Sequence, residues 1–184
     1  MAILKHGALQ PNEWQEVSDD AALPETGSVI VSLERWRRDE ASLRTSNRAI
    51  GVRLQNTQSP LALTNDIDRL SLVVLDFPKF SDGRAFSQAR LLRDRLGFTG
   101  EIRATGNVLR DQYLFMTRCG IDAVELPDGT PIEGFLKALG EFSVWYQPAA
   151  DARVPAMALR HGGKPQTGSA STVVNDSVAA MWAY

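Results

Sequence analysis

Reactive side chains are scarce in this chain, whose 184 residues include one cysteine, Cys119, and two histidines, His6 and His161. A disulfide within the chain is therefore impossible, and one copy cannot supply the four thiolates of an iron–sulfur cluster. A zinc site made of protein side chains would have to be rich in carboxylates. We therefore expect no metal site, and no cofactor motif is evident. Cys119 falls at the end of a predicted helix without a second cysteine, which predicts a packed, unreactive thiol.

An excess of charge of either sign is also absent. The chain has 22 acidic and 20 basic side chains, for a net charge of -2. This balance argues against binding to nucleic acid, because nucleic-acid-binding domains usually carry a basic excess. No apolar run reaches the length of about 18 residues that a membrane-spanning helix needs, and the N-terminus lacks a signal-peptide core. We expect a cytoplasmic protein with neither nucleic acid nor membrane as a partner.

Apolar residues make up 43% of the chain, which is ordinary for a compact globular domain. Residues 1–27 are polar and without a clear period, so we expect an irregular N-terminal segment. Residues 28–146 predict an α/β domain. Residues 147–184 are rich in proline, alanine, glycine and serine, which favours a flexible tail with an apolar, aromatic terminus.

Short apolar runs alternate with helical patterns inside the predicted domain. The runs expected to form strands are 29–33, 50–54, 70–76, 101–105 and 123–126, with 143–146 as a candidate edge strand. The segments expected to form helices are 34–44, 84–96, 108–119 and 132–142. This alternation predicts a single domain with a mostly parallel five-stranded sheet flanked by helices. We favour a flavodoxin-like or receiver-like arrangement, with a half-barrel as the alternative.

Ligands of open parallel sheets bind beyond the carboxyl ends of the strands, and three loops lie there: 76–84, 105–110 and 125–128. These loops and the strand before the second loop contribute the candidate ligand- or partner-binding residues, none of which is assigned a catalytic role. They are Asp76, Lys79, Asp82, Arg84, Arg103, Thr105, Asn107, Arg110, Asp111 and Glu125.

Two interpretations of these loops remain open. In a phosphoacceptor receiver domain Asp76 and Thr105 would end the third and fourth strands, but the acidic pair and the lysine of that site are missing. In an anion site Gly106 and Asn107 would open a helix, where free amides and the helix dipole favour negative charge. No glycine-rich nucleotide motif accompanies them, and capping of the helix by Asn107 explains the same residues.

Three long strings of residues resemble a known bacterial family. They are DFPKFSDGRAFSQARLLRDRLG at 76–97, EIRATGNVLRDQ at 101–112 and RCGIDAVEL at 118–126. Together they are similar to the domain of unknown function 934 family (DUF934), over about residues 28–146. Members of that family are commonly labelled probable oxidoreductases of sulfite reduction and accompany the sulfite reductase haemoprotein. The resemblance implies a place in sulfate assimilation, with that haemoprotein as partner.

The main functional hypothesis follows from this resemblance and from the scarcity of cysteine. We expect an accessory protein of assimilatory sulfite reduction, which binds or supports the haemoprotein by delivering electrons or substrate. The aromatic residues Trp182 and Tyr184 are candidate docking residues. One alternative is a small-ligand or flavin-dependent oxidoreductase with a non-covalent flavin. Another is a degenerate receiver-like interaction module.

Overall fold

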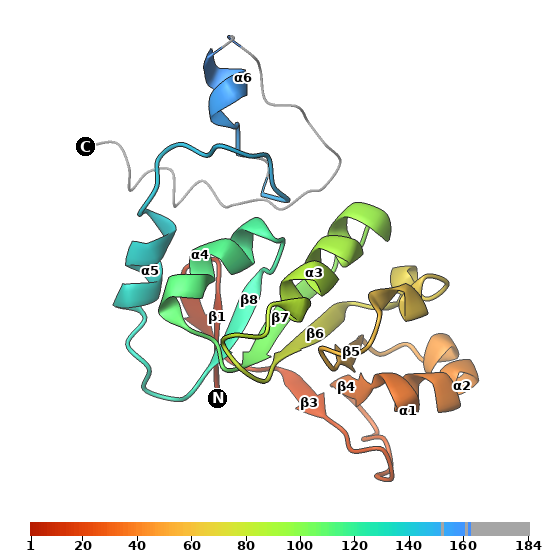
Figure 1. The fold of residues 1–184 in the computed structure, drawn as a ribbon. Helices are drawn as coiled ribbons and strands as arrows, with labels where there is room; N and C mark the ends of the chain where they lie inside the picture. The colour runs from red at the N-terminus through yellow and green to blue at the C-terminus, as the bar shows by residue number, and fades with distance from the viewer. Residues whose placement is uncertain (152, 161, 163–184) are drawn as a thin grey trace.

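The computed structural model describes residues 1–151, 153–160 and 162, and the eight strands found among them lie in one sheet (Figure 1). The strands are β1 (Ala2–Lys5), β2 (Ala8–Gln10), β3 (Trp14–Glu16), β4 (Ser28–Ser32), β5 (Ile50–Leu54), β6 (Leu72–Phe77), β7 (Glu101–Gly106) and β8 (Ala123–Leu126). Their order across the sheet is β2-β1-β8-β7-β6-β5-β4-β3. The five strands predicted from the sequence are β4 to β8, and they form its centre.

The order of the strands makes this sheet a half-barrel. From β3 to β8 each strand is the parallel neighbour of the next one in the chain. A doubly wound sheet needs a reversal of strand order, with helices on both faces. Here every crossover steps in the same direction, so the helices that follow fall on the same face. The flavodoxin-like or receiver-like arrangement is therefore wrong, and the half-barrel alternative is confirmed.

The N-terminal residues 1–27 are not irregular as expected, because they contribute β1, β2 and β3. β1 pairs antiparallel with β8 and with β2. The turn between β1 and β2 has positive φ angles at His6 (50°) and Gly7 (79°), as a two-residue type I′ hairpin requires. Ile3 and Leu4 are buried in the core. Strands of three or four residues are too short to reveal an alternating pattern, which explains why the sequence did not predict them.

The helices from α1 to α5 follow the predicted segments, whereas α6 lies in the segment predicted as a tail. They are α1 (Leu33–Arg38), α2 (Glu40–Thr45), α3 (Arg84–Arg90), α4 (Arg110–Arg118), α5 (Glu133–Leu139) and α6 (Ala156–Arg160), with short helical turns η1 (Pro60–Leu63), η2 (Ile67–Arg69) and η3 (Leu91–Arg95). The predicted helix 34–44 is interrupted at Asp39. The predicted helix 84–96 is α3 continued by the π-helical turn η3. Asn107 does not cap α4, whose N-cap is Leu109.

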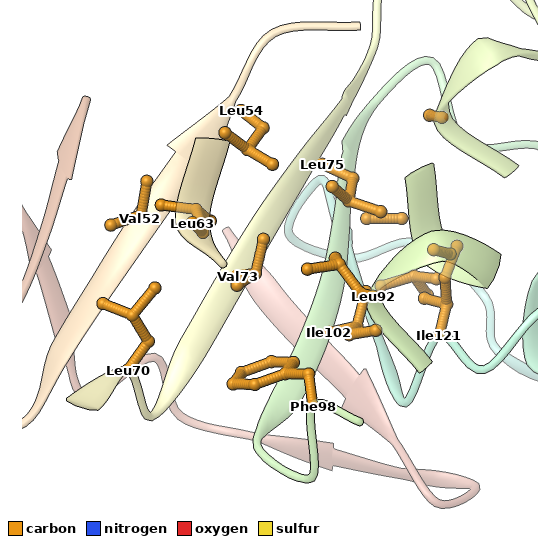
Figure 2. Packing of buried hydrophobic residues seen from close by; sticks show 14 of the residues in the cluster. Val52, Leu54, Leu63, Leu70, Val73, Leu75, Leu92, Phe98, Ile102 and Ile121 are labelled. Carbon is orange, nitrogen blue, oxygen red and sulfur yellow. The ribbon is translucent and has the colours of Figure 1, made fainter. Parts of the chain in front are cut away.

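One face of the sheet builds the main core with these helices (Figure 2). Val73, Leu75 and Phe77 alternate along β6 and belong to this core. Figure 2 shows Val73 and Leu75 among the side chains of the core cluster, which also includes Leu92 of η3. Burial of so many aliphatic side chains supplies most of the stability that a domain of this size needs.

The segment after α5 differs from its prediction. Residues 143–146 form no strand, and only an isolated bridge joins Trp145 to Pro155. The start of the segment predicted as a flexible tail contacts Arg118 of α4. Its guanidinium pairs with Asp151 at 2.9 Å and stacks over the ring of Trp145 at 4.2 Å. Trp182 and Tyr184, the candidate docking residues, lie outside the described residues.

Candidate functional site

The face of the sheet opposite the main core carries Leu72, Val74 and Asp76 of β6, and we call it the open face. At its base Trp14 packs against a small apolar cluster of Ile30, Leu72 and Val74. Trp14 begins β3, so the segment 10–14 between β2 and β3 crosses this face. In barrels of this class, ligands bind at the carboxyl ends of the parallel strands. Polar side chains at that end of the open face are therefore the candidates for a functional site.

Four polar side chains of adjoining strands β5 to β8 lie there, and we call them the carboxyl-end row: Arg53, Asp76, Thr105 and Glu125. Asp76 and Thr105 are register partners between β6 and β7. The hydroxyl of Thr105 donates to Oε2 of Glu125 at 2.6 Å. Nε of Arg53 lies 3.7 Å from Oδ1 of Asp76, and its Nη1 lies 3.0 Å from Oε1 of Glu16. The row thus consists of two neighbouring side-chain pairs, Arg53 with Asp76 and Thr105 with Glu125.

The surroundings of Asp76 shift the pKa of its carboxyl group. Burial raises the pKa of Asp76. The charge of Arg53 lowers this pKa and the charge of Glu125 raises it, and the net shift is upward. Its side chain is still 29% exposed, so solvent and ligands reach it. Partly buried carboxyl groups with a raised pKa are typical of sites that transfer protons or bind ligands.

The raised pKa gives a testable prediction for stability. A carboxyl group whose pKa is higher in the folded protein than in the unfolded chain stabilises the folded state at pH values below its unfolded pKa. This contribution is lost as the pH rises through the folded pKa. The variant Asp76→Asn is therefore expected to have a higher free energy of unfolding than the wild type at neutral pH. The difference should disappear in acid, where the wild-type carboxyl group is protonated in both states. Urea unfolding followed across this pH range measures it.

Asp82 provides the matched control of opposite sign. The hydrogen bond from the side chain of Arg84 lowers the pKa of Asp82 to about 2. Its stabilising contribution is present above its ordinary pKa and is lost as the pH falls through the folded value. Asp82→Asn should therefore destabilise the protein at neutral pH, and a stabilising effect of this variant would contradict the electrostatic assignment.

An open depression of about 460 Å³ adjoins the carboxyl-end row. Its lining includes Glu16, Asp19, Ser32 and Arg53. The hydroxyl of Ser32 donates to Oδ1 of Asp19 at 2.6 Å. The depression and the row carry more carboxylates than cations, so this end of the open face is acidic and rich in hydrogen-bond acceptors.

The sequence-predicted residues divide into two groups. Asp76, Thr105 and Glu125 belong to the carboxyl-end row, and Arg103 lies two residues before Thr105 on the same strand face. The others lie in the outer loops and in the first turns of α3 and α4, and all of them except the partly buried Asp82 are exposed; they are Lys79, Asp82, Arg84, Asn107, Arg110 and Asp111. Asp82 pairs with Arg84 at 2.6 Å and accepts from the amide of Asn56. Among the described residues, no hydrogen bond or ion pair joins these six to the row.

The backbone amides of the turn after β7 already donate hydrogen bonds within the fold. The N–H of Asn107 donates to the carbonyl of Phe77 at 2.7 Å, and the N–H of Val108 donates to the carbonyl of Gly106. Gly106 has a φ of 94°, and a Cβ there would lie 2.6 Å from the carbonyl oxygen of Phe77. These two amides therefore do not form a cradle for a phosphate group, and the residues present do not fit a flavin phosphate at this turn.

Arg53, Glu16 and Ser32 were not among the predicted site residues. Arg53 had a signal in the sequence, because it is the single charged residue in the apolar run Ile50–Leu54. A charged side chain in a buried strand is costly unless it is paired or functional. Glu16 had none, since it lies on β3, which the sequence did not reveal.

The remaining expectations concern the thiol, metals and membranes. Cys119 is buried, and burial raises its pKa to about 11, as expected of a packed thiol. The described part of the chain contains no cluster of three or more histidine, cysteine, aspartate or glutamate side chains suited to a metal ion. Within the same residues, no helix has the length and apolar character to span a membrane.

Comparison with known proteins identifies one family. The model of a family described as bacterial protein of unknown function, DUF934, matches residues 51–157. This match begins at β5 and extends into α6, so it includes the whole carboxyl-end row. Neither the curated proteins nor the solved structures contain a match.

Proposed function

The chain belongs to the DUF934 family of bacterial proteins, and on that premise we propose that it is an accessory protein of assimilatory sulfite reduction. Its partner in this proposal is the sulfite reductase haemoprotein, as the resemblance of its sequence implies. One copy of the chain has a single cysteine and cannot ligate an iron–sulfur cluster alone. The electron-transfer chemistry is therefore assigned to the partner, and binding is assigned to this chain.

The observation that carries the proposal is the open end of the half-barrel. A complete barrel would surround its carboxyl-end residues with eight loops, whereas this sheet leaves Arg53, Asp76 and Glu125 of the row partly exposed. Thr105 of the row is buried. An enzyme that takes up an anion such as sulfite attracts it with basic groups. The acidic end of the open face is complementary to such a surface. Complementary charge favours fast association and the correct orientation of the partner.

Co-purification of the tagged full-length chain with the haemoprotein tests this proposal. We expect a complex that weakens as the salt concentration rises, because the contact is electrostatic. The charge reversal Glu16→Lys, at an exposed position next to Arg53, should reduce the amount retained by about tenfold, which corresponds to a loss of about 1.4 kcal/mol. Glu133→Lys on α5 is the matched control and should leave retention unchanged. Absence of a complex, together with normal sulfite reduction in a deletion strain, would exclude the proposal.

A second candidate function is an enzyme that acts on a small ligand at the carboxyl-end row. The raised pKa of Asp76 favours it, because an upward shift makes a carboxyl group better suited to general acid–base catalysis. The absorption spectrum of the purified protein separates the two candidates. A visible absorption band with release of a flavin on denaturation would favour the oxidoreductase, whereas the accessory role predicts a colourless chain.

A further inference from the structure

A second pocket, of about 270 Å³, lies on the open face below the carboxyl-end row. Its walls come from β1, β7 and the crossing segment 10–14, and they include Lys5, Glu101 and Arg103. Arg103 is 5% exposed and Lys5 is 26% exposed. Two cationic side chains thus line one small pocket on a folded sheet, which is unusual because buried charge is costly unless it is compensated.

The pocket is lined by two cations and two carboxylates, but one of the carboxylates, Glu13, is exposed to solvent. Nζ of Lys5 lies 2.6 Å from Oε2 of Glu101, and Nη2 of Arg103 lies 2.7 Å from Oε1 of the same carboxylate. Burial would raise the pKa of Glu101, but the hydrogen bond from Lys5 and the charge of Arg103 lower it overall, so Glu101 is ionised. In the less exposed part of the pocket one carboxylate, Glu101, therefore faces the two cations. The charge of the exposed Glu13 is screened by solvent and compensates them less.

Lys5 and Arg103 also have N–H donors that make no hydrogen bond or ion pair to the described residues. An ammonium group has three N–H donors, and Lys5 uses one of them on Glu101. A guanidinium has five, and Arg103 uses three, on Glu101 and on Oδ1 of Asn12. Planar N–H pairs of arginine and the point charge of lysine are the groups that bind oxyanions most strongly.

We propose that this pocket binds a small oxyanion between Lys5 and Arg103. A water molecule occupies about 30 Å³ in the liquid, so the pocket has room for an anion of four or five heavy atoms with some of its hydration water. Sulfite, sulfate and phosphate share the required chemistry. Sulfite as the physiological ligand rests on the proposed function, in which the chain would hold the anion close to its partner.

Calorimetric titration of the full-length wild-type chain with sulfite, sulfate, phosphate and chloride, at constant ionic strength, tests the site. Saturable binding of at least one oxyanion, and none of chloride, is expected. Lys5→Met and Arg103→Met should each weaken binding by about 10- to 100-fold, since each removes charge-assisted hydrogen bonds. Arg84→Met, which removes an exposed cation elsewhere, is the control and should not change the affinity.

Two further variants distinguish an anion site from a structural ion cluster. Glu101→Gln and Glu13→Gln each remove a negative charge that lines the pocket, and both should tighten oxyanion binding, Glu101→Gln more than Glu13→Gln. Loss of folding cannot produce a gain of affinity, so this result does not depend on the stability of the Arg103 variant. Absence of saturable binding to the wild type, or no tightening in Glu101→Gln, would overturn the proposal. Neither result would affect the co-purification experiment, which changes Glu16 and not the pocket.

Discussion

Replacing Trp36 by alanine is expected to lower the free energy of unfolding by about 3–5 kcal/mol. Trp36 is fully buried in the main core, between α1 and the sheet. Its Nε1 donates to Oδ2 of Asp66 at 3.1 Å, which connects α1 to the turn before β6. Alanine would leave a cavity and remove this hydrogen bond. A domain of this size is stable by about 5–15 kcal/mol, so the variant would lose a large part of its stability.

Urea unfolding, with the midpoint and slope compared, measures the effect of the Trp36 substitution. Trp36→Phe keeps most of the packing and loses the donor to Asp66, which still pairs with Arg44. It should cost less than the alanine variant, by at least about 1 kcal/mol. Phe142→Ala, at a position that is 56% exposed, is the surface control and should change stability by less than about 0.5 kcal/mol. Equal effects of Trp36→Ala and Phe142→Ala would show that α1 is not packed as described.

Removing the carboxyl group of Asp122 is expected to cost a similar amount, about 3–5 kcal/mol, through a different mechanism. Oδ2 of Asp122 lies 2.5 Å from Nη2 of Arg93 and accepts the N–H of Ile102 at 2.8 Å. The side chains of Arg93 and Asp122 are 5% and 10% exposed. Asp122→Ala therefore leaves a buried guanidinium without its counter-ion. Thermal and urea unfolding of the variant measure the loss.

A double-mutant cycle separates this ion pair from the other contacts of Arg93. Arg93 also donates to the carbonyls of Phe98, Gly100 and Gly120, so Arg93→Met should be destabilising by itself. The double variant Arg93→Met with Asp122→Ala should cost less than the sum of the two single variants, by about 1–3 kcal/mol.

The surface pair Arg90–Asp94 is the control for this cycle, because its side chains are 38% and 46% exposed. Asp94→Ala should cost at most about 1 kcal/mol. If Asp122→Ala cost no more than Asp94→Ala, the pair of Arg93 and Asp122 would not be a buried structural contact.

The carboxyl-end row could be predicted from the sequence only in part. Asp76, Thr105 and Glu125 follow from the rule that polar residues at the ends of apolar strands meet at one edge of a parallel sheet. The same rule also selected Lys79 and Asn107, because it does not say on which side of the sheet a loop residue lies. That side depends on the position of each residue in the pleat and on the path of the loop, and only the folded chain determines both.

The oxyanion pocket was beyond prediction for a related reason. Lys5 and Arg103 are 98 positions apart, and they meet because β1 pairs antiparallel with β8, next to β7. β1 has four residues, too few for its pattern to indicate a strand or a partner. The pairing of a short strand with a distant one depends on the edge of the sheet that is available to it. The local sequence of the short strand does not contain this information.

The scarcity of cysteine and histidine, the absence of long apolar runs and the five apolar strands of the central sheet were determined by the sequence alone. Composition limits the available chemistry, and apolar runs indicate buried strands wherever they lie in the fold. The tertiary structure decided the rest: that the strands follow one another in order into a half-barrel, that three N-terminal strands extend it, and that Arg53 and Arg103 face the open side. These features depend on pairing and on the pleat, and a shift of one residue in register would move every side chain to the other face.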